Sequence, residues 1–398
     1  MTISIAHFQM LQVLLLILSM VAMITSKLRL PYSVGLVFMG GILATFPIVA
    51  NITVTPDLIY KVLLPPLIFE AALFLPQKAL AKEFPLIITM ATVGVVIAAA
   101  VVTMGLHWLL AWPWISAAIF GALISATDPI SVIAIFKESH VSDRLKLLVE
   151  GESLFNDGTA AVIFTLLVGI AGGGNLSIGV IAMTLVSTVL GSLVCAIVVT
   201  TLILFMIGKT ADHLVEITLT TVAAYGSFLL AEYFHASGVL ATLVAGLIMG
   251  NRIIWGNTLT ERGHIAVTSF WEYLAFIANS FVFLLIGVRE VQQPFQQFWH
   301  ASLIAIIVLM LGRVISIYPI GLAFSAGPLR MTRSYQNILC WGGLRGALAL
   351  ALALGLPDSI PYRDEITSVA FIVVAFSIIV QGITIKPLLH YLGELKKS

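Results

Sequence analysis

Charged residues are scarce in this chain of 398 residues, where Asp, Glu, Lys and Arg together make up only 10%. Soluble globular domains carry about 25% charged residues, so the composition excludes an ordinary soluble protein. The 20 basic and 19 acidic residues nearly cancel, which leaves no global field to favour nucleic acid or an acidic partner. Cysteine is rarer still, and Cys195 and Cys340 both lie in apolar runs. We interpret them as small buried hydrophobic residues rather than as a disulfide or a metal site.

Hydrophobic residues dominate instead, at 60% of the chain. Because a helix needs about 20 apolar residues to cross a bilayer, the sequence predicts an all-α polytopic membrane protein. The first apolar run lacks the basic region and cleavage site of a signal peptide, so we expect it to be retained. Thirteen spans are predicted, near residues 8–26, 31–50, 57–76, 84–111, 113–136, 146–171, 176–207, 213–234, 237–250, 265–288, 299–326, 334–356 and 364–391.

The basic residues support this count independently, because short cytoplasmic loops carry the excess of Lys and Arg. With thirteen spans, one side of the membrane holds only Lys61, Arg289 and Arg363. Arg313 and Arg345 lie within spans. We therefore predict a plasma-membrane protein with its N-terminus outside and its C-terminus in the cytoplasm. The remaining fifteen basic residues fall on the predicted cytoplasmic side: Lys27, Arg29, Lys78, Lys82, Lys137, Arg144, Lys146, Lys209, Arg252, Arg262, Arg330, Arg333, Lys386, Lys396 and Lys397.

Acidic residues interrupt two neighbouring spans, in segments 126–129 (ATDP) and 151–158 (GESLFNDG). An ionised side chain at membrane depth costs at least about 2.5–3.5 kcal/mol unless it is paired or wetted, so such residues usually serve a function. Pro129 removes a backbone donor and disfavours helix at the residue before it, which predicts a break in the fifth span. A second break is expected in the twelfth span at 342–346 (GGLRG). Two broken spans seven apart indicate inverted repeats, as in transporters whose freed carbonyls coordinate cations.

The sixth span carries a second regularity. Ser153 and Asp157 are four residues apart, as are Glu152 and Asn156, so each pair shares a helical face. Asp157 and Ser153 can present oxygens to one small cation, because hard cations favour oxygen ligands. No His or Cys stands at metal-ligand spacing, which argues against a transition metal. The alternative for Asp157 is a neutral, hydrogen-bonded carboxylic acid inside a helical bundle.

The other charged residues are expected to support this site. We predict that Asp128 caps the half-helix that follows it and bonds to Asn156. An arginine cannot discharge by losing its proton, so an intramembrane arginine has to neutralise a carboxylate. We pair Arg313 with Glu152 and place Arg345 beside the second break, although the reverse assignment stays open. Weaker candidates are Glu70 on a pathway or an interface, Glu150 in a cytoplasmic funnel, and Glu232 with His235 at a solvated span end.

The combined motifs closely resemble the NhaP and sodium–proton exchanger branch of the cation/proton antiporters, over nearly the whole chain. The resemblance is carried by the two segments above, by 342–346, and by 64–70 (LPPLIFE). It implies a homodimer without cofactor, built as one transmembrane unit over 1–398 with no separate soluble domain. It also implies a core subdomain that moves like an elevator against a dimerisation subdomain. The core would include about 84–171 and 299–391, and the dimerisation subdomain about 8–50 and 176–250.

The resemblance also implies roles for individual residues. Asp157 would be the shared site for the cation, Na⁺ or possibly K⁺ or Li⁺, and for the proton. Ser153 and Thr127 would be further cation ligands. Glu152 would bind through water or pair with an arginine. Asn156, which precedes the ion-binding Asp, would hold the broken fifth span and favours electroneutral exchange of one proton per cation.

Together these observations predict a secondary active transporter rather than an enzyme. In this hypothesis Asp157 is either protonated or cation-bound, so cation and proton compete for one carboxylate. The empty, ionised site is expected to switch sides poorly, because bare charge is costly to bury in a moving domain. One alternative is a cation channel or uniporter with the same ligands and no proton coupling. A second is an intramembrane enzyme, but its acidic cluster would face water and hold a divalent metal with substrate phosphates.

Overall fold

The computed structural model describes residues 5–28, 30–46, 55–138, 141–173, 177–256, 258–291 and 295–395. Within these ranges its regular elements are all helices, with no strand among them, which confirms the predicted all-α class. In chain order they are α1 (Ile5–Leu28), α2 (Tyr32–Ala44), η1 (Leu58–Leu63), α4 (Leu64–Phe74), α5 (Gln77–Thr89), η2 (Met90–Gly94), α6 (Val95–Leu110), α7 (Trp114–Ser125), α8 (Ile130–Glu138), α9 (Asp143–Ala171), α10 (Ile178–Ile207), α11 (His213–Tyr233), α12 (Gly238–Ile253), α13 (Glu261–Glu290), α14 (Phe295–Ala323), α15 (Arg333–Gly342), α16 (Ala347–Leu354), α17 (Arg363–Phe376), η3 (Ser377–Gln381) and α18 (Gly382–Tyr391).

Length and composition mark eight of these helical segments, in the described part of the chain, as able to cross a membrane. Four shorter helices are apolar as well. Each of the thirteen predicted spans overlaps one helix or a run of two or three consecutive helices, but the count of thirteen crossings stays a prediction. The end of the second predicted span (47–50), residue 176, Arg29, Lys396 and Lys397 lie outside the described residues, as does the side chain of Lys137.

The helix that contains the fourth predicted span starts earlier than predicted. It runs without a gap through α5, η2 and α6, so it begins at Gln77 rather than near residue 84. Its first turns carry Lys78, Lys82 and Glu83. Hydropathy excludes these charged residues from an apolar span, whereas their intrinsic helix propensity is good.

The outer surface is apolar where a lipid bilayer would cover it. Large hydrophobic side chains project from α10 along its whole length, and they are about half exposed or more. A soluble monomer rarely exposes so long an apolar face. This face and the apolar helices fit an integral membrane protein. The side chains on α10 include Met183, Val186, Leu190, Val194, Val198, Leu202 and Phe205.

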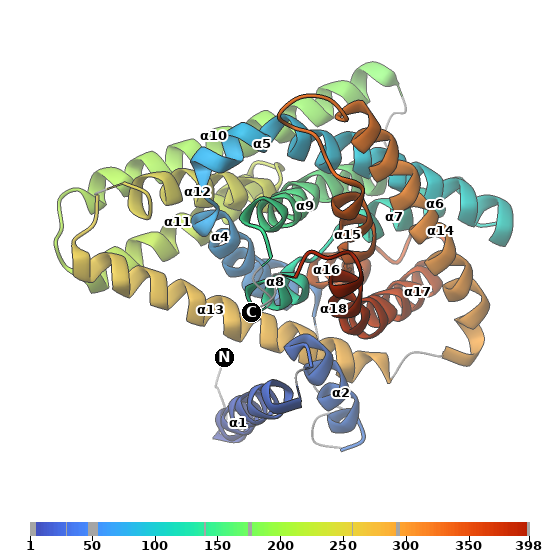
Figure 1. The fold of residues 1–398 in the computed structure, drawn as a ribbon, viewed down its shortest axis with the longest axis horizontal. Helices are drawn as coiled ribbons and strands as arrows, with labels where there is room; N and C mark the ends of the chain where they lie inside the picture. The colour runs from blue at the N-terminus through green and yellow to red at the C-terminus, as the bar shows by residue number, and fades with distance from the viewer. Residues whose placement is uncertain are drawn as a thin grey trace.

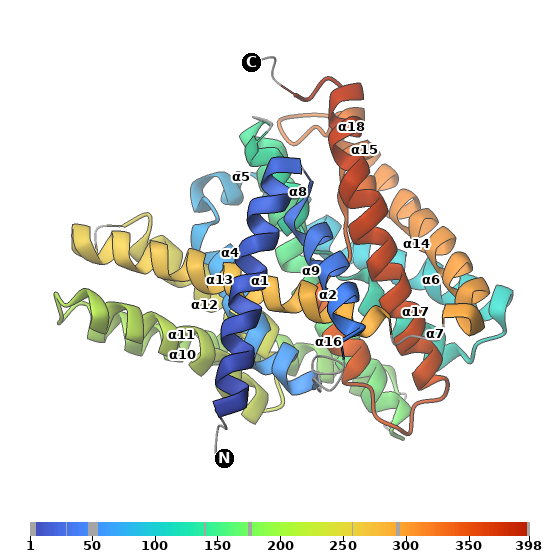
Figure 2. The same ribbon diagram turned by 90° about the horizontal axis from the view of Figure 1, so that it is seen from below.

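The buried hydrophobic side chains form two clusters, and α9 belongs to the larger one and also contacts α10 and α12 of the smaller one. The smaller cluster joins α10, α11, α12, α13 and part of α4. The larger one includes α7, α9, α14, α16 and α17. Figure 1 shows α9 near the centre, with α10 and α11 on one side and α6, α14 and α17 on the other. Figure 2 shows the start of α1 and the end of α18 on opposite sides of the molecule.

Close helix packing holds α9 in this position. Gly246 and Gly250 bring α12 against the backbone of α4, where a Cβ atom would overlap the Phe69 and Leu73 carbonyls. On the other side, α12 packs against α9, where Gly158 faces the side chain of Leu240. Small residues of this kind let helix backbones approach closely in membrane proteins. The helix with the predicted site is therefore supported by an adjoining rigid pair.

Candidate functional site

Two interrupted helices meet beside α9. Residues 126–129 separate α7 from α8, and residues 343–346 separate α15 from α16. The backbone N–H of Asp128 donates to the carbonyl oxygen of Leu344 at 2.7 Å. The two unwound stretches are therefore hydrogen-bonded directly to each other, although more than two hundred residues of chain separate them.

Two glycines at the second break are required because side-chain atoms of other segments approach their backbone closely. A Cβ atom on Gly346 would overlap the carboxyl group of Asp128. A Cβ atom on Gly343 would press against the guanidinium group of Arg313. A side chain at position 346 would push the second stretch away from the first, and one at position 343 would displace Arg313.

Two residues of α9 bind the polar groups of the first break. Ser153 Oγ donates to the carbonyl oxygen of Thr127 at 2.5 Å. Asn156 Oδ1 accepts from the backbone N–H of Thr127 at 3.1 Å, and its Nδ2 donates to Thr127 Oγ1 at 2.6 Å. The second Nδ2 hydrogen goes to Glu152 Oε1 at 3.1 Å. Every polar group of Thr127 is thus engaged by α9, which stabilises the unwound conformation.

This arrangement corrects one expectation. We predicted that Asn156 bonds to Asp128, but both of its amide hydrogens are used by Thr127 and Glu152. Asn156 therefore holds the residue before Asp128. The role predicted for Asn156, as the partner of the broken helix, fits these contacts.

The predicted pairing of Glu152 with Arg313 is confirmed. Arg313 Nη1 lies 2.8 Å from Glu152 Oε1, and the two side chains are 5% and 2% exposed. Arg313 Nη2 also donates to the carbonyl oxygen of Leu339, in the last turn of α15, at 2.6 Å. The ion pair therefore joins α9 and α14 to the second interrupted helix.

Arg345 lies at the second break, as predicted. Its side chain is fully buried, and its Nη1 approaches the carbonyl oxygen of Ala126 at 3.4 Å. Its backbone N–H donates to Ser377 Oγ at 3.0 Å. Among the described residues, its Nε and Nη2 atoms have no hydrogen-bond partner. Arg345 thus places a positive charge between the two unwound stretches.

Asp157 differs from the other acidic residues of the site. It lies one turn beyond Ser153 on α9, and its Oδ1 atom is buried without a hydrogen-bond partner in the described part of the chain. Its carboxyl group is close enough for its charge to interact with Asp128, Glu152 and Arg345. A buried carboxylate oxygen without a donor is unfavourable unless a proton or a cation neutralises it.

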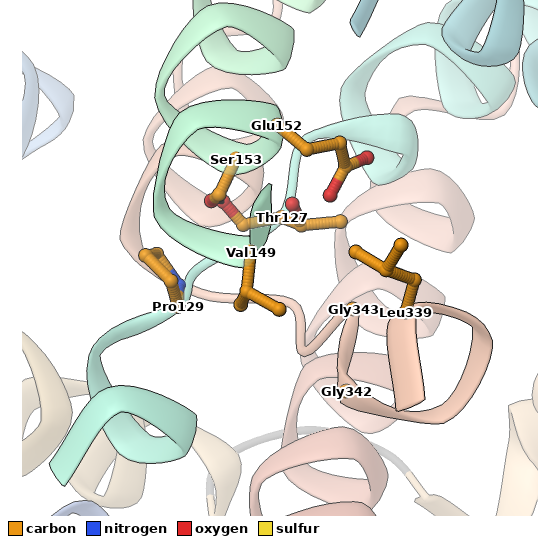
Figure 3. A pocket seen from close by; sticks show the side chains of 8 residues that line it. All are labelled: Thr127, Pro129, Val149, Glu152, Ser153, Leu339, Gly342 and Gly343. Carbon is orange, nitrogen blue, oxygen red and sulfur yellow. Dashed lines mark hydrogen bonds between the residues drawn. The ribbon is translucent and has the colours of Figure 1, made fainter. Parts of the chain in front are cut away.

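A narrow pocket lies beside α9, between the two helix breaks. Its empty volume is about 190 Å³ including the open mouth. In Figure 3, side chains of α9 face Thr127 on one side and the end of α15 on the other. Asp157 lies beyond this pocket, one helical turn past Ser153. The lining residues are Thr127, Pro129, Val149, Glu152, Ser153, Leu339, Gly342 and Gly343.

The weaker candidates lie elsewhere. Glu150 Oε1 is 3.9 Å from Lys146 Nζ on the same helix, and Glu70 lies half-buried on α4. Glu232 accepts from the backbone N–H of Gly238 at 3.1 Å and from Tyr60 at 3.3 Å. It therefore stabilises the start of α12, a role that its position at a span end did not indicate. Ser377 and Gln381 were not predicted, because their only signal in the sequence is a spacing of four within an apolar run.

Comparison with known proteins identifies relatives over nearly the whole chain. The family model described as sodium/hydrogen exchanger, transmembrane, matches residues 13–391. The Na(+)/H(+) antiporter ApNhaP of Aphanothece halophytica is 38% identical over 370 residues, which cover 92% of this chain and 70% of that protein. The Na(+)/H(+) antiporter NhaH of Halobacillus dabanensis is 32% identical over 407 residues, covering 98% and 99% of the two chains. The solved structure of the sodium proton antiporter MjNhaP1 from Methanocaldococcus jannaschii has the same fold, with a TM-score of 0.77 over 98% of each chain and 19% identity.

The buried ion pair gives a testable prediction about stability. Glu152→Gln leaves Arg313 charged and buried without its counter-ion, a change that typically costs about 3–5 kcal/mol. Arg313→Met is expected to cost less, because the remaining carboxyl group can take up a proton. Thermal unfolding of the purified protein in detergent measures both effects.

A matched control is Lys61→Met, which removes half of the exposed pair with Asp57, whose side chains are 48% and 74% exposed. Exposed pairs contribute about 0–1 kcal/mol, so this variant should unfold close to the unaltered protein. Equal midpoints for Glu152→Gln and Lys61→Met would contradict a stabilising role for the buried pair.

Proposed function

Because this chain belongs to the sodium/hydrogen exchanger family, we propose that it exchanges Na⁺, or possibly Li⁺ or K⁺, for H⁺ across a membrane. The observation that carries the proposal is the buried, unpartnered Oδ1 atom of Asp157, beside two helix breaks. This oxygen needs either a proton or a cation. The curated relatives described above are named as antiporters, which favours exchange over the enzyme alternative.

The proposed cation ligands are oxygens of Asp157, Ser153 and Thr127, with Glu152 as a ligand through water. Ser153 and Thr127 are already hydrogen-bonded to each other, so their oxygens are held in place before a cation arrives. Preorganised ligands lower the cost of binding. Glu152 is neutralised by Arg313, which leaves Asp157 as the one residue proposed to change its occupant.

Charge balance supports exchange of one proton for one cation. Three carboxylates and two guanidinium groups gather at the site, so one negative charge is uncompensated when Asp157 is ionised and empty. Either a proton or a monovalent cation on Asp157 restores neutrality. We infer that both occupied forms cross between sides and that the empty form does not, because moving a bare buried charge is costly. The carboxylates are Asp128, Glu152 and Asp157, and the guanidinium groups are Arg313 and Arg345.

We also propose how the chain crosses the membrane and which parts of it move during transport. Thirteen spans, with the N-terminus outside and the C-terminus in the cytoplasm of a plasma membrane, fit Figure 2, where the start of α1 and the end of α18 lie on opposite sides of the molecule. We propose that a core of about 84–171 and 299–391 moves like an elevator against a homodimer-forming part of about 8–50 and 176–250. The separate hydrophobic cluster that includes α10, α11 and α12 supports 176–250 as one part of this division, whereas buried residues of α1 and α2 belong to the larger cluster.

The first test removes the exchangeable carboxyl group. Asp157→Asn cannot alternate between a protonated and an ionised form, so we expect cation-dependent proton flux in proteoliposomes to be lost. The exposed Asp364→Asn serves as control, because that side chain is 92% exposed and is not among the residues of the proposed site. Exchange by Asp157→Asn at a rate near that of the control would exclude Asp157 as the shared site.

The second test varies pH on both sides of the liposome membrane. At low pH Asp157 stays protonated and binds little cation, and at high pH few protons are available for the return step. We therefore expect a bell-shaped dependence of the exchange rate on pH. Raising the cation concentration should move the acidic limb to lower pH, because the two ions compete. An acidic limb that stays at the same pH when the cation concentration is raised would argue against competition at one carboxylate.

The third test concerns stoichiometry and separates the antiporter from its alternative. One-for-one exchange moves no net charge, so imposing a potential with a potassium gradient and valinomycin should leave the initial rate unchanged. Flux that follows the potential would contradict electroneutral exchange. Sodium flux without any accompanying pH change would instead favour the channel or uniporter.

A further inference from the structure

The second helix break interrupts one particular hydrogen bond. In a continuous α-helix the N–H of residue 345 would donate to the carbonyl oxygen of residue 341, four positions earlier. Here α15 ends at Gly342 and that bond is not made. The N–H of Arg345 and the carbonyl oxygen of Trp341 are instead bound by two side chains from another helix.

These two side chains are Ser377 and Gln381, and they form a chain of hydrogen bonds in one direction. The N–H of Arg345 donates to Ser377 Oγ at 3.0 Å, and Ser377 Oγ donates to Gln381 Oε1 at 2.5 Å. Gln381 Nε2 then donates to the carbonyl oxygen of Trp341 at 3.0 Å. Three hydrogen bonds through two side chains thus replace a single helical bond.

The local backbone favours this geometry. Ser377 and Gln381 are the first and last residues of η3, a π-helical segment that continues α17 into α18 without a gap. Single π-helical turns in membrane helices often accompany functional sites. Both side chains are at least 99% buried, so water does not compete for their partners. Gln381 Nε2 also donates to the sulfur of Met310 on α14, at an N···S distance of 3.5 Å, so both amide hydrogens have acceptors.

The pair also determines where Arg345 lies. Its backbone N–H is fixed by Ser377, and its Nη1 reaches Ala126 in the first unwound stretch. The neighbouring residue Leu344 accepts from the N–H of Asp128. Any closing of the second break into regular helix would move both of these contacts.

We propose that Ser377 and Gln381 are positioning residues that hold the second helix break open and so place Arg345 at the transport site. They touch neither the cation nor the proton. They act by satisfying the two backbone groups that helix closure would otherwise join. Their effect on transport rests on the proposed exchange function, whereas their effect on the backbone does not.

Hydrogen exchange tests the backbone role without transport. In Gln381→Met and in Ser377→Ala a buried backbone group loses its partner, so amide exchange in peptides covering 343–347 should become about tenfold faster or more. The control is Thr384→Val, which removes the 2.8 Å bond from Trp341 Nε1 to Thr384 between the same two helices but leaves the pair intact. The proposal would be overturned if amide exchange at 343–347 were as slow in Gln381→Met as in Thr384→Val.

Transport in proteoliposomes tests the consequence. We expect Gln381→Met and Ser377→Ala to lower the maximal rate about tenfold or more, and Thr384→Val to stay within about twofold of the unaltered protein. Transport rates equal to that of Thr384→Val would overturn the role in transport. Slow transport with unchanged amide exchange at 343–347 would overturn it as well. If the unaltered protein shows no cation-dependent proton flux, the proposed function fails, and the exchange measurement alone decides whether the pair holds the break.

Gln381→Glu separates positioning from general damage. A protonated glutamic acid can accept from Ser377 and donate to the Trp341 carbonyl oxygen, as glutamine does, whereas the ionised form has no hydrogen to donate. Its rate relative to the unaltered protein at the same pH should therefore rise as pH falls. The same ratio for Gln381→Met should stay flat. A flat ratio for both variants would contradict the hydrogen-bond mechanism.

Discussion

The hydrogen bond between the N–H of Asp128 and the carbonyl oxygen of Leu344 fixes the centre of this protein, because it joins two helices at the points where each is unwound. Unwinding frees backbone donors and acceptors, and in a membrane interior no bulk water is present to satisfy them. Every freed group therefore needs a partner from the protein. Much of the polar composition of the interior follows from this requirement.

The partners come from three separate helices. On α9, Ser153 and Asn156 engage Thr127 at the first break. At the second break, Arg313 binds the last turn of α15, and η3 supplies Ser377 and Gln381. These residues are scattered along the sequence but serve one purpose, which is to stabilise extended backbone where regular helix would otherwise form. An antiporter needs such backbone because it leaves polar groups and half-helix ends near the transported ion.

Local chemistry made part of this arrangement predictable. Proline after Asp128 and the glycines at 342–346 mark the two breaks, because they act on the backbone of their own segment. Charge predicted that a buried arginine pairs with Glu152, since a buried arginine needs a carboxylate, but it left the choice between Arg313 and Arg345 open. The partner of Asn156 did not follow, because an amide can bind any of several groups in a turn and only the packing of α9 selects Thr127. The roles of Ser377 and Gln381 were also beyond prediction, because their partners lie in another helix and a π-helical turn has no sequence signal of its own.

The same residues that stabilise the breaks also border Asp157, the carboxyl group proposed to exchange its proton for a cation, so the proposal links ion occupancy to structure. Ser153 precedes Asp157 by one turn and binds the Thr127 carbonyl oxygen, so a cation drawn to Asp157 and Ser153 also contacts the edge of the first break. Arg345 belongs to the second break, where Ser377 binds its backbone N–H, and its side chain reaches the carbonyl oxygen of Ala126 in the first break. A change of charge at Asp157 therefore alters the balance between these two stretches. Because the stretches are hydrogen-bonded to each other, they are expected to respond together, so the proton and the cation act on one structural unit rather than on two independent sites.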